Sequence, residues 1–351
     1  MTMQSTEMVL ELTNVTMRFR QRQRGTDLGS ILRGLVSPVF KTVTALDGLS
    51  LRVARGEVVA YAGANGAGKS TTIKLCTGLI RPETGTVSAL GLDPSRDRVK
   101  YVGRIGVVFG QRSELWFDQP VSASFNWKRV VWDIPDDRYK AMEGLVRELL
   151  GLDSFYNTTA RELSLGQRMR ADLGLALLHE PELLFLDEPT LGLDALAKKQ
   201  MLNIIKHLNE QNNITAIVTS HDMSELEQLA GRIVLMHQGR MAFDGDFDML
   251  RREFSDWRYL VIDTPGAAPV LNMADYIASD GSRHSYRFNT AEITVAELLA
   301  RASAQQQIND VETHRPDIDE VIAGIYEKWS VGSPADQHVA TKQTETVHPS
   351  L

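Results

Sequence analysis

The chain has 351 residues, a net charge of −7 and an ordinary globular composition, so it can form one large or two modest domains, and its acidic balance argues against general nucleic-acid binding. Its one cysteine, Cys76, excludes an internal disulfide framework, fits a reducing cytoplasm and is interpreted as a small buried apolar residue. Because no run of 18 or more apolar residues occurs and the N-terminus does not resemble a signal peptide, we expect a cytosolic chain.

Two stretches near the N-terminus, residues 8–19 and 42–53, alternate apolar and polar residues as half-buried strands do. Between them lies a basic insert at residues 20–41, with a short apolar island at 31–36. An insert of this kind could lie against an anionic membrane surface or a partner. A solvated surface loop is the alternative, and the sequence leaves both open.

Residues 63–71 read G-A-N-G-A-G-K-S-T and match the phosphate-binding pattern G-x-x-x-x-G-K-[ST] between an apolar strand and a helical stretch. Glycines let the backbone curl so that its N–H groups point at phosphate oxygens, and the helix adds its positive end. In this interpretation Lys69 pairs with the β- and γ-phosphates and the Ser70 hydroxyl holds Mg²⁺. A glycine-rich turn that binds nothing is the alternative. The candidate binding residues are Gly63, Asn65, Gly66, Ala67, Gly68, Lys69, Ser70 and Thr71.

Residues 105–120 begin as a buried strand and then become polar and aromatic. Gln111, at the expected end of this strand, can reach a metal ion or an attacking water. Trp116 and Phe117 are large and apolar in what should be a loop, so either something covers them or both rings fold back on the core.

Residues 121–160 are mostly helical by their spacing, and the apolar residues that we expect on one face are Leu145, Leu149 and Leu150. The segment L-S-L-G-Q-R follows at residues 163–168, where Ser164 precedes a long helical pattern. A small polar residue and a glycine at the head of a helix provide the chemistry of a second phosphate-binding helix end.

Two carboxylates follow the buried strand at residues 183–186. Asp187 is expected to bind Mg²⁺, usually through water, and Glu188 to polarise the water that attacks the γ-phosphate. The next apolar strand, residues 214–219, ends at Ser220 and His221. A lone histidine at a strand end is more often a capped residue than a catalytic one, but the expected neighbouring strand carries Asp187, which favours a place in the site.

These motifs, in this order, resemble the nucleotide-binding subunit of an ABC transporter over roughly residues 8–250. The ordered set consists of the phosphate loop at 63–71, Gln111, L-S-L-G-Q at 163–167, L-L-F-L-D-E-P-T at 183–190, G-L-D at 192–194 and His221. The resemblance implies an α/β P-loop NTPase with a RecA-like core, an antiparallel β subdomain and a helical signature subdomain at about residues 113–174. It also implies ATP and Mg²⁺ as cofactors, and a head-to-tail dimer of two copies or of two paralogues.

The resemblance assigns roles to further residues. Ser164 and Gly166 would contact the γ-phosphate of an ATP bound in the other subunit, and His221 would hold the γ-phosphate and the water. The remaining nucleotide contacts would be Phe19, as the aromatic that stacks on adenine, Gln167 and Asp194, the last in communication across the dimer. The family's signature is commonly L-S-G-G-Q, and Leu165 replaces its first glycine here.

Two segments are more specific than the family core: V-F-G-Q-R-S-E-L-W-F-D-Q-P at residues 108–120 and E-L-S-L-G-Q-R-M-R-A-D-L at 162–173. They are similar to ATPase subunits of prokaryotic drug- and viologen-type exporters, which implies a separate membrane permease that contacts the Gln111–Asp118 region from the cytoplasmic face. The insert at 20–41 is similar to that of polysaccharide exporter ATPases, which keeps a glycan or lipid-linked substrate open. An importer ATPase and a soluble ABC ATPase that acts on DNA or the ribosome are the alternatives.

We expect an ABC ATPase domain at residues 1–252, a small α+β accessory domain at 253–330 and a disordered polar tail at 331–351. The accessory domain could take part in dimer contacts. Its predicted elements are strands at 257–262, 285–288 and 307–311, a helix opened by a capping box from Thr294 to Glu297, and an amphipathic helix at 316–329.

Overall fold

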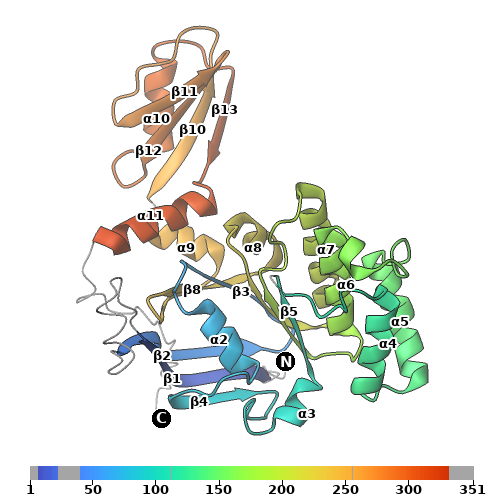
Figure 1. The fold of residues 1–351 in the computed structure, drawn as a ribbon. Helices are drawn as coiled ribbons and strands as arrows, with labels where there is room; N and C mark the ends of the chain where they lie inside the picture. The colour runs from blue at the N-terminus through green and yellow to red at the C-terminus, as the bar shows by residue number, and fades with distance from the viewer. Residues whose placement is uncertain (1–6, 23–39, 111, 255, 332–351) are drawn as a thin grey trace, which may run out of the picture. The chain divides into compact units, whose positions relative to one another are not determined.

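The computed structural model describes residues 7–22, 40–110, 112–254 and 256–331 (Figure 1). Gln111, most of the basic insert and the polar tail after residue 331 lie outside the described residues. The chain divides into two compact units, residues 1–250 and 251–351, and the division falls within helix α9 (Phe247–Phe254).

A six-stranded sheet forms the centre of the first unit, in the order β5-β6-β7-β3-β8-β9. Its strands are β3 (Val58–Gly63), β5 (Ile105–Phe109), β6 (Leu183–Asp187), β7 (Thr215–Thr219), β8 (Arg232–His237) and β9 (Arg240–Gly245). Only β9 runs antiparallel to its neighbour. Every residue of β3 and β7 is buried, which explains why these segments are continuous apolar runs and do not alternate.

A three-stranded antiparallel sheet, in the order β2-β1-β4, packs beside this centre. Its strands are β1 (Met8–Arg22), β2 (Phe40–Ala54) and β4 (Thr84–Ala89). Alternate residues of β1 and β2, among them Leu10 and Leu51, share one apolar core with Tyr61 of β3 and Ile73 of α2 (Lys69–Cys76). The helix that follows the phosphate loop is therefore packed between the two sheets.

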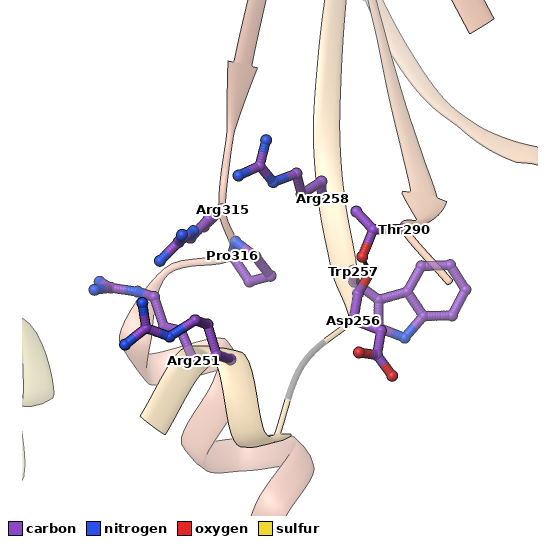
Figure 2. Close-up of a pocket in the computed structure, with 8 residues that line it drawn as sticks. Arg251, Asp256, Trp257, Arg258, Thr290, Arg315 and Pro316 are labelled. Atoms are coloured by element: carbon purple, nitrogen blue, oxygen red, sulfur yellow. Dashed lines mark hydrogen bonds between the residues drawn. The ribbon is translucent and has the colours of Figure 1, made fainter. Parts of the chain in front are cut away.

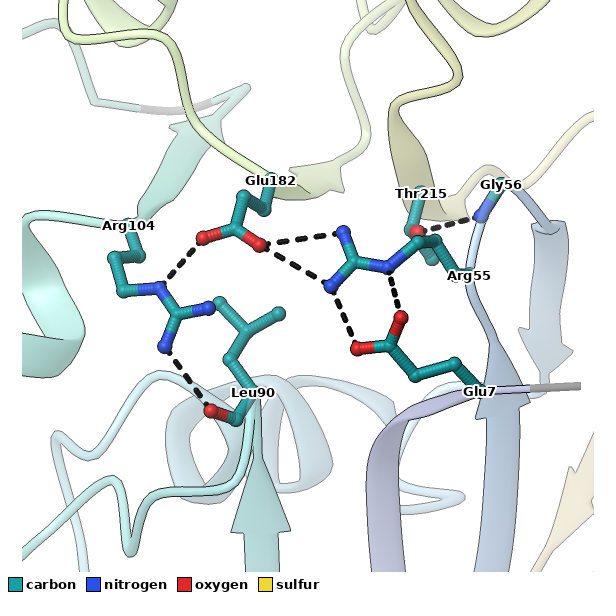
Figure 3. Close-up of polar contacts among 7 residues, drawn as sticks. All are labelled: Glu7, Arg55, Gly56, Leu90, Arg104, Glu182 and Thr215. Atoms are coloured by element: carbon teal, nitrogen blue, oxygen red, sulfur yellow. Dashed lines mark hydrogen bonds and ion pairs between the residues drawn. The ribbon is translucent and has the colours of Figure 1, made fainter.

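Ion pairs join residues beside the strand ends of these two sheets (Figure 3). Arg55 pairs with Glu7 at 2.7 Å and with Glu182 at 3.2 Å. Arg104 reaches Glu182 from the other side at 2.5 Å and donates to the Leu90 carbonyl at 3.1 Å. The hydrogen bond from Arg104 is the main cause that lowers the pKa of Glu182. The network connects the ends of strands that are distant in the sequence.

Helices form the remaining layers of the first unit (Figure 1). They are α3 (Arg98–Val102), α4 (Val121–Val131), α5 (Asp136–Leu150), η1 (Ala160–Glu162), α6 (Leu165–Leu177), α7 (Ala195–Asn212) and α8 (Met223–Leu229). The predicted apolar face of α5 is wrong in one member, because Leu145 is 48% exposed. The buried stripe consists of Tyr139, Val146 and Leu150, and Leu145 lies about 100° around the helix from Val146.

The second unit has its own four-stranded antiparallel sheet, in the order β11-β12-β10-β13, with α10 against one face. Its elements are β10 (Trp257–Asp263), β11 (Ala274–Asp280), β12 (Arg283–Asn289), α10 (Val295–Ser303), β13 (Asp310–His314) and α11 (Ile318–Val331). The capping box from Thr294 to Glu297 forms as predicted. The sequence missed β11 and placed β13 three residues too early, because both lie at the sheet edges and expose most of their side chains.

Candidate functional site

The phosphate loop has a backbone that only glycine adopts without strain. Gly66 and Gly68 have φ angles of 81° and 110°. A Cβ at Gly68 would lie 2.7 Å from the Ala45 carbonyl oxygen, and one at Gly63 would lie 2.6 Å from that of Met236. The loop between β3 and α2 therefore needs its glycines both for backbone conformation and for space.

Lys69 begins α2 and lies at the base of the loop, 7% exposed. Its ammonium donates to the carbonyl of Gly63 at 2.5 Å. Burial lowers the pKa of Lys69, and the nearby carboxylates of Glu188 and Asp187 oppose that shift. Ser70, the next residue, is exposed. The structure thus brings the phosphate-loop lysine together with both predicted carboxylates.

Asp187 lies at the carboxyl end of β6, directly opposite Thr219 of β7. The Thr219 hydroxyl donates to Asp187 Oδ1 at 2.7 Å and accepts from the Glu188 N–H at 3.0 Å. One hydroxyl therefore orients the side chain of one carboxylate and the backbone of the next. Thr219 was missed in the sequence, although a hydroxyl residue at the end of the strand beside Asp187 was a usable signal.

Glu188 has a φ of 56°, in the left-handed region that a residue with a side chain rarely adopts. Its Oε1 lies 2.7 Å from Nε2 of His221. Close packing holds this backbone, because a Cβ at Gly110 would lie 2.2 Å from the Glu188 carbonyl oxygen. The Gly110 N–H donates to the Asp187 carbonyl at 2.7 Å. Gln111 follows directly in the chain but lies outside the described residues.

A buried polar network supports the segment that carries His221. Glu225, 4% exposed, accepts from the hydroxyls of Thr190 at 2.5 Å and Ser220 at 3.0 Å. Lys198 of α7 lies 2.7 Å from the same carboxylate. These contacts tie Ser220, the residue next to His221, to two helices, and no motif in the sequence indicated them.

Ser164 is exposed and caps α6 as predicted. It forms a capping box with Gln167, with bonds of 3.2 Å and 2.9 Å. A Cβ at Gly166 would lie 3.2 Å from Cβ of Ala197, so this glycine allows α6 and α7 to approach closely. Leu165 is 40% exposed beside it.

The phosphate loop and the Ser164 segment belong to different layers of the first unit. Helix α2 packs on β2, β3, β4 and β6, whereas α6 packs on α4, α5, α7 and β5 (Figure 1). Asp194 caps α7 by accepting from the Ala197 N–H at 2.8 Å. Phe19 lies on β1, 36% exposed. Lys69, Asp187, Glu188 and His221 therefore form one cluster, and Ser164 and Gly166 form a second surface.

Comparison with known proteins identifies the family. Residues 46–191 match the family model described as ABC transporter. The chain is 32% identical over 236 residues to the bacitracin transport ATP-binding protein BcrA of Bacillus licheniformis, which covers 67% of this chain and 76% of that protein. It is 33% identical over 291 residues to the daunorubicin resistance ATP-binding protein DrrA3 of Streptomyces coeruleorubidus, covering 79% and 89%. The chain belongs to the ABC transporter family.

Further comparisons agree with this assignment to the ABC ATPases. The chain is 30% identical over 207 residues to the energy-coupling factor transporter ATP-binding protein EcfA2 of Clostridium tetani, covering 58% and 72%. A solved ATP-binding subunit of an ABC transporter superposes with a TM-score of 0.58 at 24% identity, over 70% of this chain and 93% of that one. The predicted fold class is confirmed, and the chain is an ATP-binding subunit and an ATP hydrolase of the ABC type.

Proposed function

We propose that this ABC ATPase subunit powers export through a separate membrane permease by ATP-driven, head-to-tail dimerisation. The observation that carries the proposal is that one chain has both a catalytic cluster around Lys69 and Glu188 and a second, exposed surface that begins at Ser164. Each surface supplies half of a nucleotide site, so two subunits complete two sites. The drug-transport names of BcrA and DrrA3 support export.

In the catalytic cluster, the phosphate-loop N–H groups and Lys69 bind the β- and γ-phosphates of ATP. Ser70 and Asp187 would offer the hard oxygen donors that suit Mg²⁺, which would neutralise phosphate charge. Gln111, the further ligand predicted from the sequence, lies outside the described residues. The Glu188 carboxylate takes a proton from the attacking water, and His221 orients both the water and the γ-phosphate. The strained Glu188 backbone aims this carboxylate.

On the second surface, Ser164, Gly166 and Gln167 contact the γ-phosphate bound in the other subunit. The N-terminal end of α6 adds its partial positive charge there. Asp194, at the head of the neighbouring α7, senses the opposite subunit. Phe19 offers an exposed ring on which adenine stacks. The second subunit is another copy of this chain or a paralogue.

An exposed aromatic patch supports the permease as partner. Trp116 is 43% exposed and packs on Trp127 at 5.5 Å between ring centroids, and Phe117 is 58% exposed. Grouped exposed apolar rings mark contact surfaces. Arg168 of α6 lies 5.8 Å from the Phe117 ring, so the patch contacts the helix that Ser164 caps. This contact is a direct route by which ATP-driven movement of α6 reaches a permease on the cytoplasmic face.

Among the described residues, every helix is too short or too polar to span a bilayer. The similarity to EcfA2 makes import the second candidate direction.

The partner is tested by capture from native membranes. Tagged Glu188→Gln protein with ATP is incubated with detergent-solubilised membranes, and bound proteins are identified by mass spectrometry. We expect a polytopic permease, and severalfold less of it when Trp116→Ala and Phe117→Ala are added. Capture of ribosomes or DNA in its place would refute transport and leave ATP hydrolysis standing.

The direction is tested with the captured permease in inside-out vesicles, with fluorescent daunorubicin as the first compound. ATP-dependent accumulation inside these vesicles is the result expected for export. ATP-driven loss of preloaded compound would establish import.

A further inference from the structure

A pocket of about 200 Å³ in the second unit has an unusual concentration of guanidinium groups (Figure 2). Its lining includes four arginines and one carboxylate, that of Asp256. The arginines are Arg251, Arg252, Arg258 and Arg315. They come from α9, from β10 and from the segment that joins β13 to α11, so residues distant in the sequence meet at one pocket.

The position of Arg258 is set by the alternation of β10. Arg258 shares a face of the strand with Leu260 and Ile262, which are fully buried in the core of the second unit. Its half-buried guanidinium therefore lies at the end of an apolar row, where a charge needs a polar partner. Within the described part of the chain, the Arg258 side chain makes no hydrogen bond or ion pair, and the same holds for the Arg252 side chain on α9.

The lining holds one carboxylate, and among its guanidinium groups those of Arg252 and Arg258 have no partner within the described residues. Figure 2 draws the Arg251, Arg258 and Arg315 side chains on one side of the view and the Asp256 side chain on the other. The Asp256 carbonyl accepts both the N–H and the hydroxyl of Thr290, at 2.8 Å and 2.9 Å. Like charges gathered in one pocket repel, and a bound anion would relieve that repulsion.

We propose that this arginine pocket binds a phosphate group carried by a small metabolite or a lipid headgroup. The guanidinium forks of Arg252 on α9 and Arg258 on β10 suit the several oxygens of a phosphate, because each fork can donate two parallel hydrogen bonds. Trp257 also lines the pocket, and the Arg287 guanidinium lies over its ring at 4.8 Å from the ring centroid. The site is separate from the phosphate loop and gives the second unit a ligand of its own.

The test measures binding of inorganic pyrophosphate to the full chain by calorimetry. A non-hydrolysable ATP analogue and Mg²⁺ are present throughout, so that the phosphate loop is occupied. We expect Arg258→Gln to weaken binding at least about tenfold, as expected for the loss of a charge-assisted hydrogen bond, and Arg258→Lys to weaken it less. The control is Arg283→Gln on β12, which breaks an exposed ion pair with Glu312 outside the pocket and should leave pyrophosphate affinity unchanged.

A vesicle assay separates the two sources of phosphate. The chain is sedimented with phosphatidylcholine vesicles with and without phosphatidic acid. Sedimentation that depends on phosphatidic acid and on Arg258 assigns a lipid headgroup, and pyrophosphate binding without it assigns a soluble ligand. Absence of binding in both assays, or equal binding by parent and Arg258→Gln, would overturn the proposal.

A second variant tests the pocket in case Arg258→Gln does not fold. Arg252→Gln changes an exposed residue of α9, so its thermal unfolding should match that of the parent. We expect it to lower pyrophosphate affinity severalfold. Unchanged affinity in Arg252→Gln, together with an unfolded Arg258→Gln, would count against the pocket.

Discussion

At the scale of single residues, Glu188 combines a strained backbone with a directed side chain. Its N–H is held by Thr219, its carbonyl packs on Gly110, and its carboxylate reaches His221 at 2.7 Å. Glu188→Gln keeps the shape and removes the basic oxygen. We expect ATP turnover to fall by roughly 10²–10⁴ and ATP-dependent dimerisation to persist, measured by phosphate release and size-exclusion chromatography. Glu210→Gln, on the exposed side of α7, is the control, and normal hydrolysis in Glu188→Gln would refute its role as base.

The backbone strain at Glu188 has its own test. A left-handed residue with a side chain costs about 1–3 kcal/mol, which glycine avoids. We therefore expect Glu188→Gly to have a free energy of unfolding about 1 kcal/mol greater than Glu188→Ala, measured in urea. At Glu210, inside α7, the order should reverse, because glycine is the poorer helix former. If the glycine variant were the more stable one at both positions, or the alanine variant at both, backbone strain at Glu188 would be contradicted.

The sequence predicted which residues meet here but not how they are held. Order and spacing of the motifs place Asp187, Glu188 and His221 at the ends of neighbouring strands, and the pairing of β6 with β7 confirms that neighbourhood. The positive φ of Glu188 and the bridging hydroxyl of Thr219 depend on register and close packing between segments far apart in the chain. No local pattern encodes those contacts.

At the scale of elements, Ser164 has two separable tasks: it caps α6 and, by our proposal, contacts ATP in the other subunit. Ser164→Ala should cost about 1 kcal/mol of stability through the lost cap. Ser164→Asp restores a capping oxygen but places a negative charge against the γ-phosphate. We expect near-parental unfolding in urea for Ser164→Asp together with loss of ATP-dependent dimerisation. If Ser164→Asp dimerises at the same ATP concentrations as the parent, Ser164 does not contact ATP across the dimer interface.

The ion pairs between the two sheets predict a pH dependence. Arg104 lowers the folded-state pKa of Glu182, so the pair stabilises the fold above the unfolded-state pKa and loses its effect as pH falls through the lower folded value. Glu182→Gln should therefore lower the unfolding temperature at neutral pH. The unfolding temperature of the variant should also fall less than that of the parent on acidification below about pH 4.5. Unfolding temperatures of parent and variant across that range test this, with Glu210→Gln as the exposed control. Parallel pH curves would contradict the coupling.

Element predictions succeeded where burial imposes a pattern on the sequence. Strands β3, β6 and β7 are continuous apolar runs because both of their faces are covered, and β6 and β7 were predicted within about two residues. Most side chains of strand β11 are exposed, and the strand is held by its backbone pairing with β12. Its sequence therefore has no apolar alternation that would predict a strand. The arginine pocket was also invisible, because its members are dispersed from α9 to the start of α11.

At the scale of the whole molecule, the two units have separate apolar cores, one built around β1, β3 and α2 and the other around β10, β12 and α10. The ABC family model covers residues 46–191, in the first unit only. Nucleotide chemistry and the proposed phosphate pocket therefore belong to different cores. A ligand stabilises the cooperative unit that binds it.

Calorimetry of the full chain should therefore show two unfolding transitions that respond to different ligands. A non-hydrolysable ATP analogue with Mg²⁺, at about 100 times its Kd, should add about 2.7 kcal/mol to the free energy of unfolding of the first unit. It should raise the transition temperature of that unit and leave the other transition unchanged. Pyrophosphate, added in the presence of saturating analogue, should raise the transition temperature of the second unit. Arg258→Gln should abolish this second shift. Lys69→Ala should abolish the first shift and keep the second. A single transition that both ligands raise together would show that the two cores unfold as one cooperative unit.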